Sequence, residues 1–386
     1  MRTPSLFLPF AAFTLAAAPL ATAQQFYGDP PDETHPWAVH DMNRPQPPRV
    51  EPGTFSTQAE PGKPPSDAVI LFDGTEASMK NWTFGKPDKS WALVDGAFQC
   101  VPGSGSAVTK EQFGDCQLHI EWSAPTDVKG DSQGRGNSGV FLPGNTEVQV
   151  LDNYNNPTYA DGFAGSVYGV MPPMANALRK PGEWQVYDIV FRRPLFKDGK
   201  EIDPGRVTVF CNGVLLQDST PLEGGGGHKG RSHPRAFPEK GPLSLQDHGN
   251  TTRFRNIWYR PLPPRAAEGG TDGQLSPEAT EAKRKEIAAE IRKDAAGKQG
   301  KDKMLRLMES LCYEVDPAAL EQSTKMLDEF LAGVKATPKD KAEGRKGEVM
   351  QVRNAVDYLM KHKRLPGDFA AKGAINEIVK ENGWDK

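Results

Sequence analysis

Polar side chains that could perform acid–base chemistry alternate with valines in one short stretch, GNTEVQVLDNY at residues 144–154. If this stretch is a strand, Val148 and Val150 face one way, and Glu147 and Gln149 face the other. A carboxyl group can accept or donate a proton, and an amide both donates and accepts hydrogen bonds. Glu147 is therefore the first candidate for a catalytic group.

Two further stretches repeat this arrangement. In PLSLQDH, residues 242–248, Gln246 and His248 face away from the leucines, and in NSGVF, residues 137–141, Asn137 and Gly139 face together. Three such strands predict a polar, concave sheet face that takes a hydroxyl-rich ligand, because amides match hydroxyl groups as both donors and acceptors. A glycine in that face lets a sugar ring approach the backbone.

Each of these residues also has a plainer interpretation. Glu147 could be a rim carboxylate paired with an arginine such as Arg135, because ion-pair networks also use acids. His248, at a strand end, is a candidate proton shuttle or a solvated loop histidine. The aromatic residues Tyr154, Tyr168 and Trp184 could stack on a pyranose ring or pack in the core.

A glycine-rich loop, GGGGHKGRSHP at residues 224–234, is a weaker candidate site. His228 and His233 could form part of a metal or anion site, but the composition favours a mobile loop. The run has no GK[ST] ending, and Ser138 does not lie in a G-x-S-x-G elbow. These motifs therefore indicate neither nucleotide binding nor a serine hydrolase.

The elements that position these residues are mainly β-strands from about residue 68 to 264. Period-two patterns recur in QLHIEW (117–122) and RVTVF (206–210), and Asn212-Gly213 predicts a tight hairpin turn. Short strands separated by Gly/Pro turns, without interleaved helices, predict a β-sandwich.

A helical domain is predicted from residue 276 to 386, after a linker at 265–275. Ser276-Pro277-Glu278 and Asp316-Pro317 are typical helix starts. Apolar residues then recur at spacings of three and four, which indicates a small bundle. The sequence of the bundle contains no candidate catalytic or metal-binding motif. One alternative is that the bundle docks another protein.

The N-terminus predicts export to the periplasm or the outside of the cell. Residues 1–23 have the charge, apolar run and Ala-x-Ala end of a signal peptide; the alternative is a retained membrane anchor. We expect no membrane span after its removal. Residues 24–67 are proline-rich and predict an extended lead-in.

The charge balance argues against a nucleic-acid-binding or membrane-surface protein, and four cysteines are too few for a dense disulfide framework. The 47 Lys+Arg residues nearly balance 50 Asp+Glu residues, so no strong field marks a nucleic-acid or membrane-surface protein. Cys100 and Cys116 could bridge adjacent strands or be buried free thiols.

Together these motifs resemble the 3-keto-disaccharide hydrolase domain family (DUF1080). The resemblance covers residues 68–263 and rests on LFDGT (71–75), RGNSGVFL (135–142), EVQVLDNY (147–154), GSVYG (165–169) and GPLSLQDHG (241–249). It implies a concanavalin A-like jelly roll in an exported protein that acts on glycosides oxidised at C3. It does not extend to the helical domain.

The resemblance also implies a mechanism. A ketone at C3 acidifies the C2 hydrogen, so a base can form an enolate, and elimination at C1 followed by water addition gives net hydrolysis. We expect Glu147 and His248 to share the acid and base roles. The residues predicted to bind the sugar are Arg135, Asn137, Gln149, Asp152, Tyr168 and Gln246.

Three alternatives remain open. No cofactor is required by the sequence, but a divalent metal held by Glu147, Asp152 and His248 could polarise the ketone. Glu147 and Asp152 could act as the carboxylate pair of an ordinary glycosidase, although five residues apart on a continuous strand they face opposite ways. The domain could also be a lectin-like module without turnover.

Overall fold

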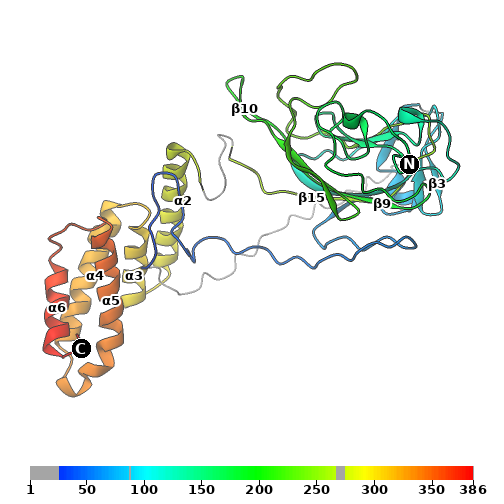
Figure 1. Cartoon of the computed structure of the whole chain (residues 1–386). Helices are drawn as coiled ribbons and strands as arrows, with labels where there is room; N and C mark the ends of the chain where they lie inside the picture. Colours follow the sequence, from blue (N-terminus) through cyan, green and yellow to red (C-terminus); the bar gives the residue numbers. More distant parts are fainter. Residues whose placement is uncertain (1–25, 87, 267–273, 386) are drawn as a thin grey trace, which may run out of the picture. The chain divides into compact units, whose positions relative to one another are not determined.

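The computed structural model of the protein describes residues 26–86, 88–266 and 274–385 (Figure 1). It divides the chain into two compact units: one comprises Pro48–Gly269, and the other comprises the residues up to Pro47 together with Gly270–Lys386. The predicted signal peptide lies outside the described residues. Among the residues that are described, no helix is long and apolar enough to cross a membrane.

The first unit is a sandwich of antiparallel sheets, as predicted (Figure 1). The eight-stranded sheet has the order β13-β12-β9-β6-β15-β4-β3, with β1 paired to β15. Its strands are β1 (Val69–Phe72), β3 (Ala92–Val94), β4 (Ala97–Gln99), β6 (Cys116–Ser123), β9 (Gln185–Arg192), β12 (Arg206–Cys211), β13 (Val214–Pro221) and β15 (Arg253–Pro261).

The second sheet of the sandwich carries the polar stretches identified above. It has five strands in the order β2-β5-β14-β7-β8. They are β2 (Trp82–Phe84), β5 (Ala107–Thr109), β7 (Ser138–Leu142), β8 (Thr146–Val150) and β14 (Ser244–Leu245). Short elements complete the unit: the hairpin β10 (Leu195–Lys197) and β11 (Lys200–Asp203), and the helices α1 (Glu76–Met79), η1 (Ser132–Gly134) and η2 (Ala160–Gly162).

One core of large apolar side chains lies between the two sheets. Alternate residues of β6, among them Leu118, Ile120 and Trp122, are fully or almost fully buried in it. The predicted turn between β12 and β13 has positive φ at both central positions, 53° at Asn212 and 82° at Gly213. An Asn-Gly pair adopts these angles readily, which explains the tight hairpin.

The proline-rich lead-in divides between the two units instead of forming one tether. Residues 48–66 lie against the outer face of the eight-stranded sheet, where Ser56 Oγ donates to Glu121 Oε1 at 2.6 Å. Arg255 joins this contact, because its Nη2 donates to the Thr57 carbonyl at 2.6 Å and its Nε to Glu121 Oε2 at 2.7 Å. The lead-in thus covers the Glu121–Arg255 ion pair of the sheet and supplies the hydrogen bonds that these buried groups require.

All four cysteines are free and buried: Cys100, Cys116, Cys211 and Cys312. The considered bridge between Cys100 and Cys116 does not form. Burial raises the pKa of the Cys116 thiol, so this group stays protonated.

The second unit is a bundle of helices (Figure 1). They are α2 (Pro277–Ala296), α3 (Gly300–Ser310), α4 (Pro317–Lys335), η3 (Lys339–Arg345), α5 (Lys346–Lys361) and α6 (Ala371–Glu381). Both predicted helix starts are confirmed, since Ser276 Oγ accepts from the Ala279 N–H at 3.2 Å and Asp316 Oδ1 from the Ala319 N–H at 2.8 Å. Phe26, from the start of the lead-in, is buried in the bundle core.

Candidate functional site

The register of β7, β8 and β14 arranges the polar residues in rows. Gly139 lies opposite Gln149, and Phe141 lies opposite Glu147. β14 extends the first row, because the Gln246 N–H donates to the Gly139 carbonyl at 3.0 Å. Directly opposed residues project to the same side of a sheet. Glu147, Gln149 and Gln246 therefore share one face, as the alternation predicts.

A further segment lies along the outer edge of β8 and adds Tyr168 to this face. The Gln149 N–H donates to the Ser166 carbonyl at 3.1 Å, and the Tyr168 N–H donates to the Glu147 carbonyl at 3.1 Å. Tyr168 consequently lies beside Glu147, on the side away from the core. We call this surface the polar face. It is formed by the residues Gly139, Glu147, Gln149, Tyr168 and Gln246.

Glu147 is the titratable group at the centre of the polar face. It is only 9% exposed, and its side chain forms no hydrogen bond or ion pair within the described chain. Its carboxyl group lies over Gly139, because a Cβ at position 139 would be 2.3 Å from Glu147 Oε1. Burial raises the pKa of Glu147 from 4.5 to about 7. The group can therefore exchange a proton near neutral pH.

The alternative pairing of Glu147 with Arg135 is wrong. Arg135 Nε instead donates to Asp152 Oδ2 at 2.6 Å, and the Asp152 side chain is only 4% exposed. The backbones of the two residues are also joined, because the Asp152 N–H donates to the Arg135 carbonyl at 3.2 Å. This pair closes the end of β8 and leaves the Glu147 carboxyl without a counter-ion.

Gln133, which the sequence analysis missed, connects two of the predicted sugar-binding amides. Gln149 Nε2 donates to Gln133 Oε1 at 2.9 Å, and Asn137 Nδ2 donates to the Gln133 carbonyl at 2.7 Å. Gln149 and Asn137 are 1% and 3% exposed, whereas Gln133 is half-buried. Gln133 precedes the motif by two residues and belongs to η1, a turn with no strand periodicity to reveal it.

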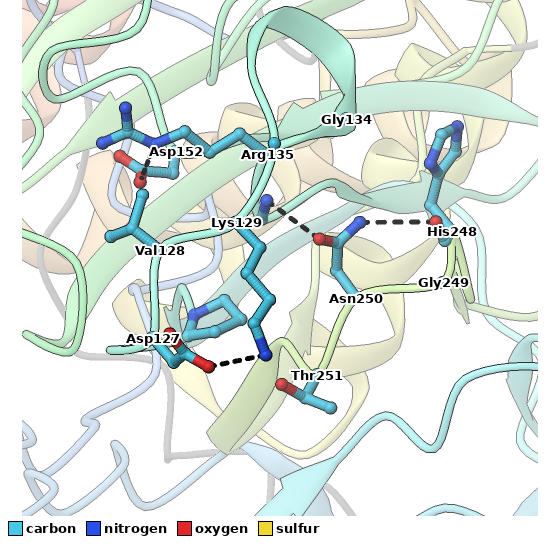
Figure 2. A pocket seen from close by; sticks show the side chains of 13 residues that line it. Asp127, Val128, Lys129, Gly134, Arg135, Asp152, His248, Gly249, Asn250 and Thr251 are labelled. Atoms are coloured by element: carbon cyan, nitrogen blue, oxygen red, sulfur yellow. Dashed lines mark hydrogen bonds and ion pairs between the residues drawn. The ribbon is translucent and has the colours of Figure 1, made fainter.

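A cavity of about 550 Å³ adjoins one end of the polar face (Figure 2). It is lined by Pro125, Asp127, Val128, Lys129, Gly130, Gly134, Arg135, Gly136, Asp152, His248, Gly249, Asn250 and Thr251. Gly136 precedes Gly139 by three residues, so this cavity begins at most about 10 Å from the glycine under Glu147.

His248 lies at the rim of this cavity and is exposed. Figure 2 shows its imidazole pointing away from Asp127, Lys129 and Thr251. His248 follows Gln246 by two residues, so their Cα atoms are at most about 7 Å apart. The structure thus groups Arg135, Asp152 and His248 around the cavity, next to the Glu147–Gln149–Gln246 group instead of within it.

A second cavity, of about 480 Å³, adjoins the other side of Glu147. It is lined by Tyr159, Asp161, Tyr168, Gly169, Gly227, His228, Lys229, Gly230 and Arg231. Tyr168 Oη lies 2.7 Å from Tyr159 Oη and 3.1 Å from His228 Nδ1. The glycine-rich loop that the sequence favours as mobile therefore contacts the polar face. Sequence spacing could not show this, because about 60 residues separate the loop from Tyr168.

Two of the predicted stacking aromatics do not belong to the polar face. Trp184 lies against the lead-in, where its backbone N–H donates to Gln58 Oε1 at 2.7 Å, and the Arg255 guanidinium lies 4.2 Å from its ring centroid. Tyr154 is 36% exposed and follows the end of β8. Only Tyr168 is close to Glu147.

Within the described part of the chain, no three His, Cys, Asp or Glu side chains come together as a metal site. Asp152, one of the three ligands considered, is bound by Arg135. Glu147, Asp152 and His248 consequently do not fit a shared ion, and no step below depends on one.

Comparisons with known proteins support a carbohydrate-related fold. A family model described as 3-keto-alpha-glucoside-1,2-lyase-like domain matches residues 67–260. No curated protein matches the chain.

Among solved structures, a "putative glycosyl hydrolase" from Parabacteroides distasonis is 45% identical, with a TM-score of 0.53; the match covers 57% of this chain and 93% of that one. A second protein so described from the same organism is 21% identical, with a TM-score of 0.38, over 50% and 99% of the two chains. The first match covers most of its own chain, which agrees with a complete sandwich domain here.

Proposed function

This chain belongs to the 3-keto-alpha-glucoside-1,2-lyase-like domain family, and on that premise we propose that it cleaves the glycosidic bond of 3-keto-glycosides and 3-keto-disaccharides. The observation that carries the proposal is the Glu147 carboxyl group, which is buried, without a counter-ion in the described chain, and has a pKa of about 7. The 45% identical "putative glycosyl hydrolase" supports the same class of activity.

Glu147 acts as the base in this proposal. Its carboxylate takes the proton from C2, and the C–H electron pair forms the enolate of the C3 ketone. The enolate then expels the C1 oxygen, which leaves a double bond between C1 and C2. Water adds across that bond and gives the free 3-keto sugar. A base with a pKa near the working pH is the most effective for such a transfer.

The remaining groups support the charges that develop. An enolate oxygen needs a hydrogen-bond donor, and we assign this role to His248, which lines the 550 Å³ cavity, or to Gln246, two residues before it. Tyr168, whose backbone N–H binds the Glu147 carbonyl, offers a phenol hydroxyl on the side of the second cavity. Burial and the bond to Tyr159 raise the pKa of Tyr168, so its hydroxyl stays protonated and can donate to the leaving oxygen.

The amides Gln149 and Asn137 act through Gln133. Both are almost fully buried and bind Gln133, whose Nε2 in turn donates to Thr158 Oγ1 at 3.1 Å and to the Gly162 carbonyl at 3.0 Å. This network therefore positions the segment that carries Tyr159. The Arg135–Asp152 pair forms the wall of the first cavity. The proposal includes export, as the N-terminal sequence predicts.

Turnover of matched substrates tests the proposal. The panel comprises 3-keto-disaccharides and 3-keto-glucosides of both anomers, each beside its unoxidised parent, with and without chelator. Release of sugar from the keto forms only, lost in Glu147→Gln, supports the reaction. Tight binding without release, unchanged in Glu147→Gln and His248→Ala, would instead identify a lectin-like module.

A further inference from the structure

The second cavity extends the polar face beyond the bond that the proposed reaction breaks. Tyr168, which lines it, is hydrogen-bonded through its backbone to Glu147, whereas Asp152, five residues further along the β8 chain, lines the first cavity. Five residues of extended chain span about 16 Å. Glu147 therefore lies between two hollows, an arrangement that suits a substrate with two parts joined at the reacting bond.

The two cavities differ in what they offer. The first cavity presents the Asn250 amide and the Thr251 hydroxyl, groups that match the hydroxyl groups of the oxidised sugar. The second cavity presents two phenol rings, and Tyr159 is 45% exposed and lies edge-on to Tyr168 with 6.3 Å between ring centroids. The leaving group is therefore expected to bind in the second cavity.

The charge of the residues that line the second cavity indicates the chemical class of this leaving group. Lys229 and Arg231 line the second cavity, both are exposed, and neither has an ion-pair partner among the residues that the structure describes. Asp161 is the one acidic residue in the lining, so the cavity carries one positive charge in excess. By contrast, the arginine of the first cavity, Arg135, is already paired with a buried carboxylate.

The loop that carries these cations is attached to the polar face. His228, adjacent to Lys229, lies 3.1 Å from Tyr168 Oη through its Nδ1. The backbone is also close, since a Cβ at Gly226 would be 1.8 Å from the Tyr168 carbonyl oxygen. Glycine is required at that approach, and it holds the cations near the reacting bond.

We propose that this second cavity is a subsite for an anionic leaving group, in which Lys229 and Arg231 bind a carboxylate or phosphate of the aglycone and Tyr159 contacts its apolar part. The inference rests on the proposed function of Glu147. Arginine binds planar carboxylates through two parallel hydrogen bonds, and an unpaired arginine is free to do so.

Three aryl 3-keto-glucosides test the subsite with the full-length chain: 4-carboxyphenyl, 4-phosphonophenyl and the neutral 4-methoxycarbonylphenyl. We expect kcat/KM for an anionic substrate to exceed that of the neutral ester about tenfold at low salt, and the advantage to fall as salt is added. The double variant Lys229→Ala/Arg231→Ala should lose the advantage and keep its rate on the neutral ester. Lys80→Ala/Lys110→Ala, which removes two exposed lysines on the β2–β5 side of the sheet, is the control and should retain it.

The outcomes separate the subsite from the reaction. Preference for the carboxylate or for the phosphonate identifies the anion, whereas equal kcat/KM for all three substrates overturns the subsite and leaves the reaction standing. If no keto substrate is cleaved, the proposed reaction is refuted. The subsite is then tested separately, by calorimetric measurement of the affinities of the unoxidised aryl glucosides. Tenfold tighter binding of an anionic glucoside, lost in the double variant, supports it, and equal affinities overturn it.

Discussion

The carboxyl group of Glu147 lies directly over the backbone of Gly139, its neighbour on the adjacent strand. A Cβ at position 139 would be 2.3 Å from Glu147 Oε1 and 2.9 Å from a ring carbon of Phe141. These contacts explain why a glycine interrupts the strand here: any larger residue displaces the carboxyl group that the proposed reaction uses.

Gly139→Ala should therefore reduce kcat at least about tenfold while the protein remains folded, since a small displacement of a catalytic group lowers the rate strongly. The measurement is kcat and KM on a 3-keto-glucoside, with circular dichroism to verify the fold. Gly241→Ala is a matched control in the same unit, because the nearest atom to its added Cβ is 3.4 Å away. Full activity in Gly139→Ala would contradict the proposed role of the Glu147 carboxyl group at this position.

The pKa of Glu147 predicts a pH dependence of activity. If the carboxylate is the base, kcat should rise with pH and reach half of its plateau at about pH 7. Glu147→Asp should retain a titration with a shifted midpoint, and Glu147→Gln should lose both the rate and the titration. A rate that does not change between pH 5 and pH 8, measured with a substrate stable over that range, contradicts the assignment.

The same burial predicts a gain in stability when the charge is removed. The folded-state pKa of Glu147 is raised from 4.5 to about 7, so the folded protein favours the protonated form. Stability that is present below pH 4.5 is lost as the pH rises through 7, by at most about 3 kcal/mol. Glu147→Gln should consequently raise the free energy of unfolding at pH 8 and change it little at pH 4.5, as urea denaturation at both values can measure. An equal effect at both pH values would show that the carboxylate is not destabilising.

Gln133 should matter more than its position in a turn suggests. Gln133→Ala leaves the buried Gln149 amide without its acceptor, which costs about 1–3 kcal/mol of stability. If Gln133 also contacts the sugar, kcat/KM should fall further than Gln149→Ala alone would lower it. Gln99→Ala, a half-buried glutamine of the other sheet, serves as the control. An unchanged KM and kcat in Gln133→Ala would limit Gln133 to a structural role.

The Arg135–Asp152 pair should stabilise the wall of the first cavity. Asp152 is 4% exposed at its side chain, so Arg135→Ala leaves a buried carboxylate without its counter-ion, bonded only by the Tyr154 N–H at 3.2 Å, and should lower the free energy of unfolding by about 3–5 kcal/mol. Lys285→Ala breaks the exposed pair with Glu281, at 57% and 67% exposure, and should change stability far less, because water screens an exposed pair. Similar losses of stability in the two variants would show that the buried pair stabilises the fold no more than the exposed pair does.

The sequence predicts the sandwich and the residues of the polar face, because period two assigns each side chain to a face. It does not predict their neighbours, because register is set by pairing between distant segments. The contact of Tyr168 with Glu147 and the approach of His228 both depend on such pairing. Gln133 is hidden in a turn, where no periodicity marks the direction of a side chain. The lead-in follows the same rule, since its composition is irregular and residues far along the chain, among them Glu121, Trp184 and Arg255, bind residues 48–66.

Proton abstraction by Glu147 is tested most directly with a 3-keto sugar that has no aglycone. 1,5-Anhydro-3-keto-glucitol deuterated at C2 can form the enolate but has no glycosidic bond to break, so glycoside cleavage does not mask the first step. Loss of deuterium from C2 would be followed by NMR with wild type, Glu147→Gln and buffer alone. We expect wild type to accelerate the loss of deuterium and Glu147→Gln to show no more than the rate in buffer. Equal exchange by wild type and Glu147→Gln, or exchange by wild type no faster than buffer, would contradict proton abstraction by Glu147.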